Sequence, residues 1–167
     1  MTRALPLLLV LAALAACRDE TPAETVRQPA EEVPFEIDGS LTFLRDGEPI
    51  TTIDIELADN DSTRTRGLMD RTEIPPATGM LFTFPRAEMQ GFWMQNTYVP
   101  LDILYFDADS ALVNVQANAV PHQLRPTYNS TAPAQFVVEV PAGFARRYGL
   151  TEGVSIDWTL GGTASRR

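Results

Sequence analysis

The stretches that decide the fold are MLFTF, residues 80–84, and LDILYF, residues 101–106. Each is apolar on both of the faces that a strand would present, and each follows a turn residue, Gly79 or Pro100. A short run of this kind is typical of a strand buried in the middle of a sheet. We therefore expect both runs to be central strands.

Weaker strand patterns lie on both sides of these two runs. In them apolar and polar residues alternate with a period of two, which predicts a strand with one buried and one solvent-facing side. The alternating runs are residues 53–57, 113–117, 136–140 and 156–160. Prolines between the runs indicate loops, as in an all-β sandwich or barrel.

Helical signals are few. Asp61 and Ser62 can cap a short helix that runs to Met69, and residues 143–148 can form one or two turns that end at Gly149. The pattern as a whole predicts a mainly β protein: a single β-sandwich or jelly-roll-like domain over residues 37–160, with one or two short helices.

Composition excludes several functions. The chain has 167 residues and a formal net charge of −9, and its 13 basic residues are all arginine. An acidic chain without clustered cations is a poor partner for nucleic acid. A single histidine and a single cysteine exclude multi-histidine zinc sites, CxxC redox pairs and internal disulfides. We therefore expect no cofactor and no nucleic-acid partner.

The N-terminus predicts a location. Residues 1–16 have the pattern of a signal peptide, and the letters LAAC at 14–17 look like a bacterial lipobox in which Cys17 is acylated. The alternative is an ordinary secretory signal followed by a chance cysteine. Residues 17–36, rich in proline and glutamate, read as a disordered tether. Residues 161–167 read as a flexible tail.

These features predict a lipoprotein that is anchored to a membrane of the bacterial envelope through the lipid on Cys17 and faces the periplasm. Position 18 is arginine instead of the aspartate that marks inner-membrane retention in enterobacteria, so the outer membrane is favoured.

The densest set of motifs lies between Arg64 and Asp102. It comprises GLMxR from Gly67, GMLFxF from Gly79, FWMxNT from Phe92 and PLDI from Pro100. In this order they resemble the domain of unknown function family numbered 192. The resemblance continues in Val138-Glu139 and Ala142-Gly143 and covers residues 53–160. It implies a single β-sandwich domain of jelly-roll type, often behind a signal or lipoprotein leader, and it implies no activity. The family often has lysine where Gln95 stands.

One group of residues suggests a binding site. Trp93, Asn96, Thr97 and Asp102 combine an aromatic ring with amide, hydroxyl and carboxylate groups, a common way to hold a sugar or a peptide. The alternative is structural: a buried tryptophan, with the amide and the hydroxyl ordering a turn before Pro100.

A second group could form an ion network. Arg66, Arg71, Asp102 and Glu139 all lie in or near the motifs, and Glu139 interrupts an apolar strand. Because an unpaired buried carboxylate is costly, we expect Glu139 to have an arginine partner. Such a network either recognises the carboxylate of a ligand or only ties a loop to the sheet.

These residues give three functional hypotheses. The favoured one is a non-catalytic binding or accessory domain for a small polar ligand, a glycan, a peptide or an envelope protein, with no catalytic residue. The second is a hydrolase that acts on an envelope polymer through Asp102 and Glu139. The third is Cu(I) binding by methionine sulfurs, which otherwise fill the core. The methionines are Met69, Met80, Met89 and Met94.

Overall fold

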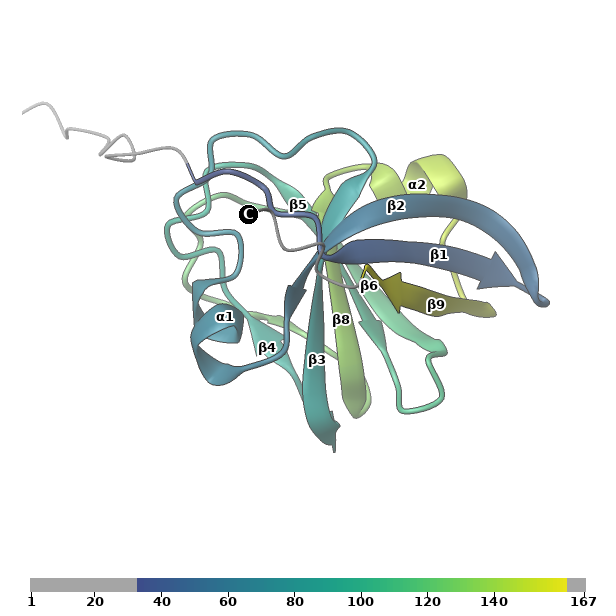
Figure 1. The fold of residues 1–167 in the computed structure, drawn as a ribbon. Coiled ribbons are helices and arrows are strands. Elements are labelled where there is room, and N and C mark those ends of the chain that lie inside the picture. The colour runs from purple at the N-terminus through teal and green to yellow at the C-terminus, as the bar shows by residue number, and fades with distance from the viewer. Residues whose placement is uncertain (1–32, 162–167) are drawn as a thin grey trace, which may run out of the picture.

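The computed structural model of the chain describes residues 33–161. These residues form nine strands and two short helices (Figure 1). The elements are β1 (Gly39–Arg45), β2 (Glu48–Ala58), α1 (Asp61–Arg66), β3 (Thr78–Glu88), β4 (Gly91–Phe92), β5 (Leu101–Phe106), β6 (Leu112–Ala119), β7 (Tyr128–Asn129), β8 (Ala134–Pro141), α2 (Phe144–Tyr148) and β9 (Val154–Leu160).

Seven strands form one sheet in the order β6-β5-β8-β3-β2-β1-β9, and β4 pairs with β7 in a separate ribbon. All neighbours in the large sheet are antiparallel except β2 and β3, which are parallel and are connected through α1. The two ends of the sheet meet where Ala111 bridges Ser155 and the Ile156 N–H donates to the Ser110 carbonyl. The sheet is therefore curled on itself. The predicted mainly β class with two short helices is confirmed.

The curled sheet separates two hydrophobic cores. The first core draws on β1, β2, β3, β5, β8, β9 and α2, so it lies inside the curl. The second core lies on the other face of β3, β5 and β8, where it is covered by β4, β7 and the loops beside them. Because side chains alternate along a strand, Val138 and Val140 of β8 face the first core and Val137 faces the second.

Both fold-deciding runs are in interior strands, as the sequence predicts. Residues 80–84 lie in β3, at the centre of the sheet, and residues 101–106 form all of β5, in which every residue is buried. A side chain at Gly79 would not fit there: an added Cβ would lie 2.7 Å from the Glu139 carbonyl oxygen. Glycine at this position therefore allows β3 to approach β8 closely.

The two helices lie near their predicted positions. α1 is capped by Asn60 and stops at Arg66, three residues before the predicted end, because Gly67 adopts φ 48° and ψ −137°. α2 ends at Gly149, as expected, in a left-handed conformation. Figure 1 shows α1 beside β3 and β4, away from α2.

Both ends of the chain lie outside the described residues. The predicted signal peptide, Cys17 and residues 162–167 of the predicted tail lie outside the described residues, as does most of the predicted tether. At the end of that tether, Phe35 packs against the second core. In the part of the chain that the structure describes, neither helix is long and apolar enough to span a bilayer.

Candidate functional site

A pocket of about 380 Å³ opens between α1, the turn that follows it, β3 and the β4 ribbon. Its walls combine aromatic and aliphatic side chains with a few charged and polar ones. The pocket is lined by Asp61, Arg64, Thr65, Arg66, Gly67, Leu68, Met69, Phe82, Phe84, Gln90, Gly91, Phe92, Trp93, Thr97 and Glu139.

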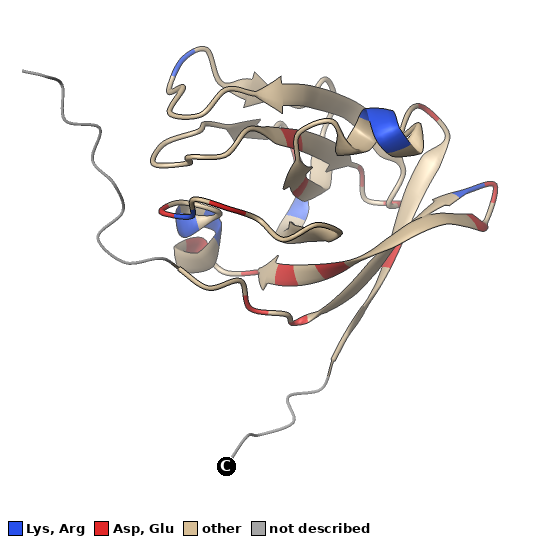
Figure 2. Cartoon of the chain, turned by 90° about the horizontal axis from the view of Figure 1, so that it is seen from above, with Lys and Arg blue, Asp and Glu red and all other residues tan. Residues whose placement is uncertain are grey.

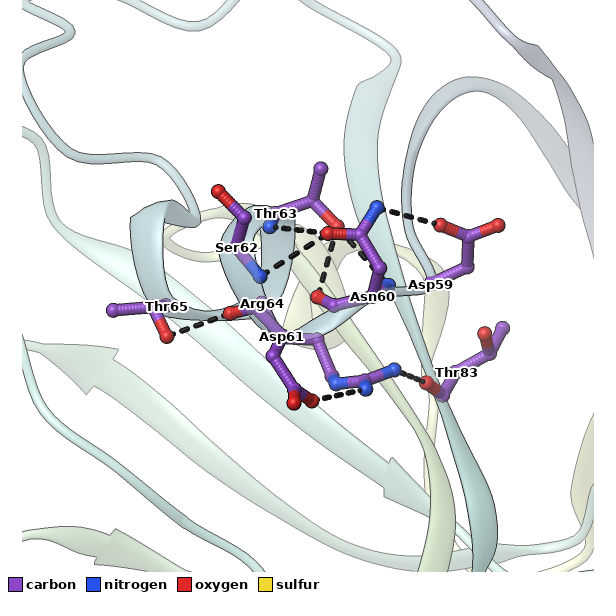
Figure 3. A network of polar contacts seen from close by, with 8 residues as sticks. All are labelled: Asp59, Asn60, Asp61, Ser62, Thr63, Arg64, Thr65 and Thr83. Carbon is purple, nitrogen blue, oxygen red and sulfur yellow. Dashed lines mark hydrogen bonds and ion pairs between the residues drawn. The ribbon is translucent and has the colours of Figure 1, made fainter.

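The first wall is α1, which its own side chains hold in place (Figure 3). Asn60 accepts hydrogen bonds from the N–H groups of Ser62 and Thr63, and the Thr63 hydroxyl accepts from the Asn60 N–H. This capping box satisfies donors that the first turn of a helix leaves free. Without it, six residues would be too few for a stable helix.

Arg64 joins α1 to the sheet. Its guanidinium donates to the Thr83 carbonyl of β3 at 2.7 Å and to the Asp61 carboxylate at 2.7 Å (Figure 3). It also lies over the Phe84 ring. The charge of Arg64 is thus matched by Asp61 within the same helix. Arg66, the last residue of α1, is exposed. Its guanidinium makes no hydrogen bond or ion pair with a described residue.

The second wall is the β4 ribbon. Gln90 and Ser130 exchange two hydrogen bonds, through the Gln90 N–H to the Ser130 hydroxyl and through the Ser130 N–H to the Gln90 carbonyl. Phe92 then packs edge-on against Phe82, with ring centroids 5.0 Å apart. Trp93 follows at the surface, where it is 49% exposed. A half-exposed indole on a fixed ribbon is a ready contact for a ligand.

Glu139 is the ionisable group buried deepest in the pocket. It stands on β8 between Val138 and Val140 and points to the opposite face of the sheet, so that its side chain is 4% exposed and lines the pocket. Its carboxylate makes no hydrogen bond or ion pair with any described residue. Burial raises the pKa of Glu139 to about 8. Burial, and then the neighbouring Glu139 carboxylate, raise the pKa of Tyr105 on β5.

The sequence of this domain matches a known protein family. Residues 42–158 match the DUF192 family, described as “Uncharacterized ACR”. The chain belongs to the DUF192 family. No curated protein matches the sequence.

Two solved structures share the DUF192 fold of this chain. A Sinorhizobium meliloti 1021 protein, described as “a putative transcription regulator”, is 32% identical with a TM-score of 0.69, and the match covers 77% of this chain and 98% of that one. A Novosphingobium aromaticivorans DSM 12444 protein of unknown function is 33% identical with a TM-score of 0.67, and the match covers 71% of this chain and 84% of that one.

Four of the seven residues predicted to bind a ligand line the pocket. They are Arg66, Trp93, Thr97 and Glu139. The expected ion network is wrong in its central pair, because Glu139 has no arginine partner among the described residues. Thr97 is buried, and its hydroxyl donates to the Gln95 carbonyl, so it also orders its own turn.

Arg71 lies away from this DUF192 pocket. One of its terminal nitrogens, Nη2, donates to both carboxylate oxygens of Glu56 at 2.8 Å, and its guanidinium lies under the Phe35 ring. The other two side-chain nitrogens have no partner in the described part of the chain. Arg71 therefore ties the turn after α1 to β2 and to the segment before β1.

Asp102 and Asn96 have structural roles. Both carboxylate oxygens of Asp102 accept backbone N–H groups, from Asn118 and from Ala145, at 2.9 Å each. Asp102 is fully buried and does not line the pocket, so the predicted pair with Glu139 shares no cavity. Asn96 is exposed in a left-handed turn, where its carbonyl accepts the Asp70 N–H.

The methionines lie in different surroundings. Met80 and Met94 are buried in the second core, Met69 lines the pocket, and Met89 is 62% exposed. Such a distribution is that of core fillers and surface residues. Nor does any group of histidine, cysteine or acidic residues suited to a metal ion occur among residues 33–161.

Sequence reasoning did not identify Arg64, Phe82, Phe92 and Gln90 as pocket residues. The signal for Phe82 was available, because Met80, Phe82 and Phe84 share one face of β3 by the period of two. Register then pairs Met80 with Glu139, so this face of β3 continues onto the Glu139 side of β8. The positions of Arg64 and Gln90 depend on contacts with distant segments and had no signal in the sequence.

Proposed function

We propose that this DUF192 domain is a non-catalytic binding domain of the bacterial envelope, anchored through the lipid on Cys17, and that its ligand occupies the pocket beside α1. The observation that carries the proposal is Glu139: a carboxylate that is 4% exposed, faces a cavity and has no partner in the described chain. The fully buried side-chain atoms without a partner among the described residues belong to Arg71, so the Glu139 oxygens remain accessible from the cavity. A ligand in the cavity can therefore reach them.

The walls supply the rest of a binding site. Phe82, Phe92 and Trp93 offer aromatic surface, whereas Gln90 and Thr97 bring polar groups to the same cavity. Pockets for small molecules combine these two kinds of surface, the first for affinity and the second for orientation. A small polar ligand, or the end of a glycan or peptide, fits a pocket of about 380 Å³.

Binding is better supported than hydrolysis. A glycosidase needs two carboxyl groups on either side of one substrate bond. Asp102 does not reach the pocket, and Asp61, the other carboxylate that lines it, is fully exposed in an ion pair with Arg64. Glu139 is therefore the one buried carboxyl group among the described residues that line the pocket.

The N-terminus supports the proposed location, and the charge bears on the choice of partner. The lipobox letters at 14–17 are the sequence evidence for an envelope lipoprotein. Figure 2 shows acidic residues on several strands and loops, and the formal net charge is −9. This charge gives no support for transferring a role on DNA from the Sinorhizobium meliloti relative to this chain.

The test is a thermal-unfolding screen of the full-length protein in detergent with N-acetylglucosamine oligomers, dipeptides and free amino acids. A ligand present at 100 times its dissociation constant stabilises by about 2.7 kcal/mol, which raises Tm by several degrees. We expect at least one such ligand, and we expect Trp93→Ala to abolish its shift while Met89→Ala, an exposed side chain that does not line the pocket, leaves it unchanged. A shift that survives in Trp93→Ala would place binding elsewhere.

A further inference from the structure

Two charges of opposite sign border the pocket without partners. Glu139 lies at its buried end, and Arg66 lies at the end of α1 on its exposed side. Neither side chain makes a hydrogen bond or ion pair with another described residue. The remaining charged groups of the lining, Arg64 and Asp61, neutralise each other at 2.7 Å. The pocket thus offers one unpaired carboxyl group, which a cation would ionise, and one unpaired arginine.

The desolvation of Glu139 makes it a strong partner for a cation. Bringing a carboxylate out of water is costly, and for most ion pairs this cost offsets the attraction. In the ligand-free protein this cost raises the pKa of Glu139 to about 8, so the buried side chain gives up its proton only near that pH. A ligand ammonium group therefore favours the ionised form of a side chain that folding already holds in place.

Besides groups that pair with Glu139 and Arg66, the ligand needs a part that fits the aromatic walls of the pocket. Phe82 and Phe92 pack edge to face, and Trp93 continues the same wall toward the surface. Leu68 and Met69 line the pocket from the turn after α1. Such surfaces favour an apolar side chain, and ring faces also attract an ammonium group.

We propose that the pocket binds a small zwitterion, an α-amino acid with an apolar side chain, with its ammonium group against Glu139 and its carboxylate toward Arg66. This inference rests on the proposed binding function and names the ligand class. A bare amine would leave Arg66 unmatched, and a neutral sugar would leave both charges unmatched.

The test compares three probes that differ by one charged group each: L-phenylalanine, N-acetyl-L-phenylalanine, which lacks the ammonium group, and 2-phenylethylamine, which lacks the carboxylate. Binding to the full-length protein in detergent is measured by calorimetry at pH 8. We expect L-phenylalanine to bind at least tenfold more tightly than N-acetyl-L-phenylalanine, which leaves the buried Glu139 unpaired. Against 2-phenylethylamine we expect a smaller difference of about two- to fivefold, because Arg66 is exposed to solvent.

Two variants test whether Glu139 contacts the ammonium group of the ligand and Arg66 contacts its carboxylate. Glu139→Gln should weaken L-phenylalanine at least tenfold and leave N-acetyl-L-phenylalanine unchanged. Arg66→Met should weaken L-phenylalanine and leave 2-phenylethylamine unchanged. Arg86→Met, which removes an exposed arginine outside the pocket, is the matched control and should change nothing.

The possible results distinguish a failure of the zwitterion proposal from a failure of the proposed binding function. N-acetyl-L-phenylalanine binding as tightly as L-phenylalanine would overturn the zwitterion, as would a glycan that binds when no amino acid does, and both results would leave the binding function standing. No binding by any amino acid, peptide or glycan probe would overturn both.

Discussion

At the scale of the residue, Glu139 and Asp102 show how differently two lone acids in apolar strands can be used. Asp102 gives both oxygens to backbone N–H groups, whereas Glu139 gives neither to the described protein. The sequence makes them look alike, because each is one carboxylate in a strand of apolar neighbours. The two differ in what lies next to them: α2 donates an N–H group to Asp102, whereas Glu139 borders a cavity. The alternation of residues along a strand predicts neither neighbour.

The raised pKa of Glu139 predicts how stability depends on pH. Between the ordinary value of 4.5 and about 8, folded Glu139 holds a proton that the unfolded chain has lost. Folding therefore takes up a proton, and the free energy of unfolding falls as pH rises through this window, by about 1.4 kcal/mol per unit. Tyr105, Arg64, Arg66 and Asp61 are the other ionisable groups around it.

Glu139→Gln should remove most of this slope and be more stable than the parent at pH 8, as measured by urea unfolding at pH 5, 6.5 and 8. Glu152→Gln, which changes an exposed carboxylate, is the control and should keep the slope. A parent protein whose stability is level from pH 5 to 8 would contradict the assigned pKa.

Asp102 gives the second prediction at this scale. Asn in its place presents an NH2 group to one of the two N–H donors, so a buried backbone donor loses its acceptor. We expect Asp102→Asn to lower the free energy of unfolding by about 3 kcal/mol. Asp109→Asn, at an exposed turn position, should lower it by less than about 0.5 kcal/mol. Equal effects in urea unfolding would remove the structural role given to Asp102.

At the scale of the element, the stability of α1 depends on its N-terminal cap, because the helix has only six residues. Asn60→Ala removes the acceptor of two N–H groups and should destabilise the protein by about 1 kcal/mol. Because α1 forms one wall of the pocket, the same change should weaken ligand binding. Ser62→Ala, in the same turn but without a capping side chain, is the control. If both variants unfold alike, the capping box does not hold α1.

The elements also show how far the sequence predicts this fold. Strands β3, β5, β8 and β9 follow from apolar runs and alternation, and α2 follows from its flanking glycines. The curl and the β4 ribbon do not, because both depend on pairing between distant segments, such as Gly91 with Asn129. The pocket depends on the same pairing. Trp93 and Glu139 could therefore be chosen as candidates from their chemistry, but the missing arginine partner of Glu139 could not be foreseen.

At the scale of the whole molecule, the proposed lipid anchor on Cys17 makes a prediction of its own. Cys17→Ser should prevent acylation and move the protein from the membrane fraction to the soluble fraction of the periplasm, because the lipid is the proposed anchor. Fractionation followed by immunoblotting measures this. Met94→Leu, a buried change that leaves the lipobox intact, should remain in the membrane fraction. Membrane retention of Cys17→Ser would contradict the proposed anchor.

The most direct test of the central claim is the pKa of Glu139 itself, measured by carboxyl-carbon NMR in the full-length protein with and without L-phenylalanine. We expect a pKa of about 8 for Glu139 in the free protein, because burial disfavours the ionised form. We also expect this pKa to fall when the ligand ammonium group pairs with the carboxylate, since an opposite charge favours the ionised form. A pKa near 4.5 in the free protein, or a value of 8 that saturating L-phenylalanine leaves unchanged, would contradict the central claim.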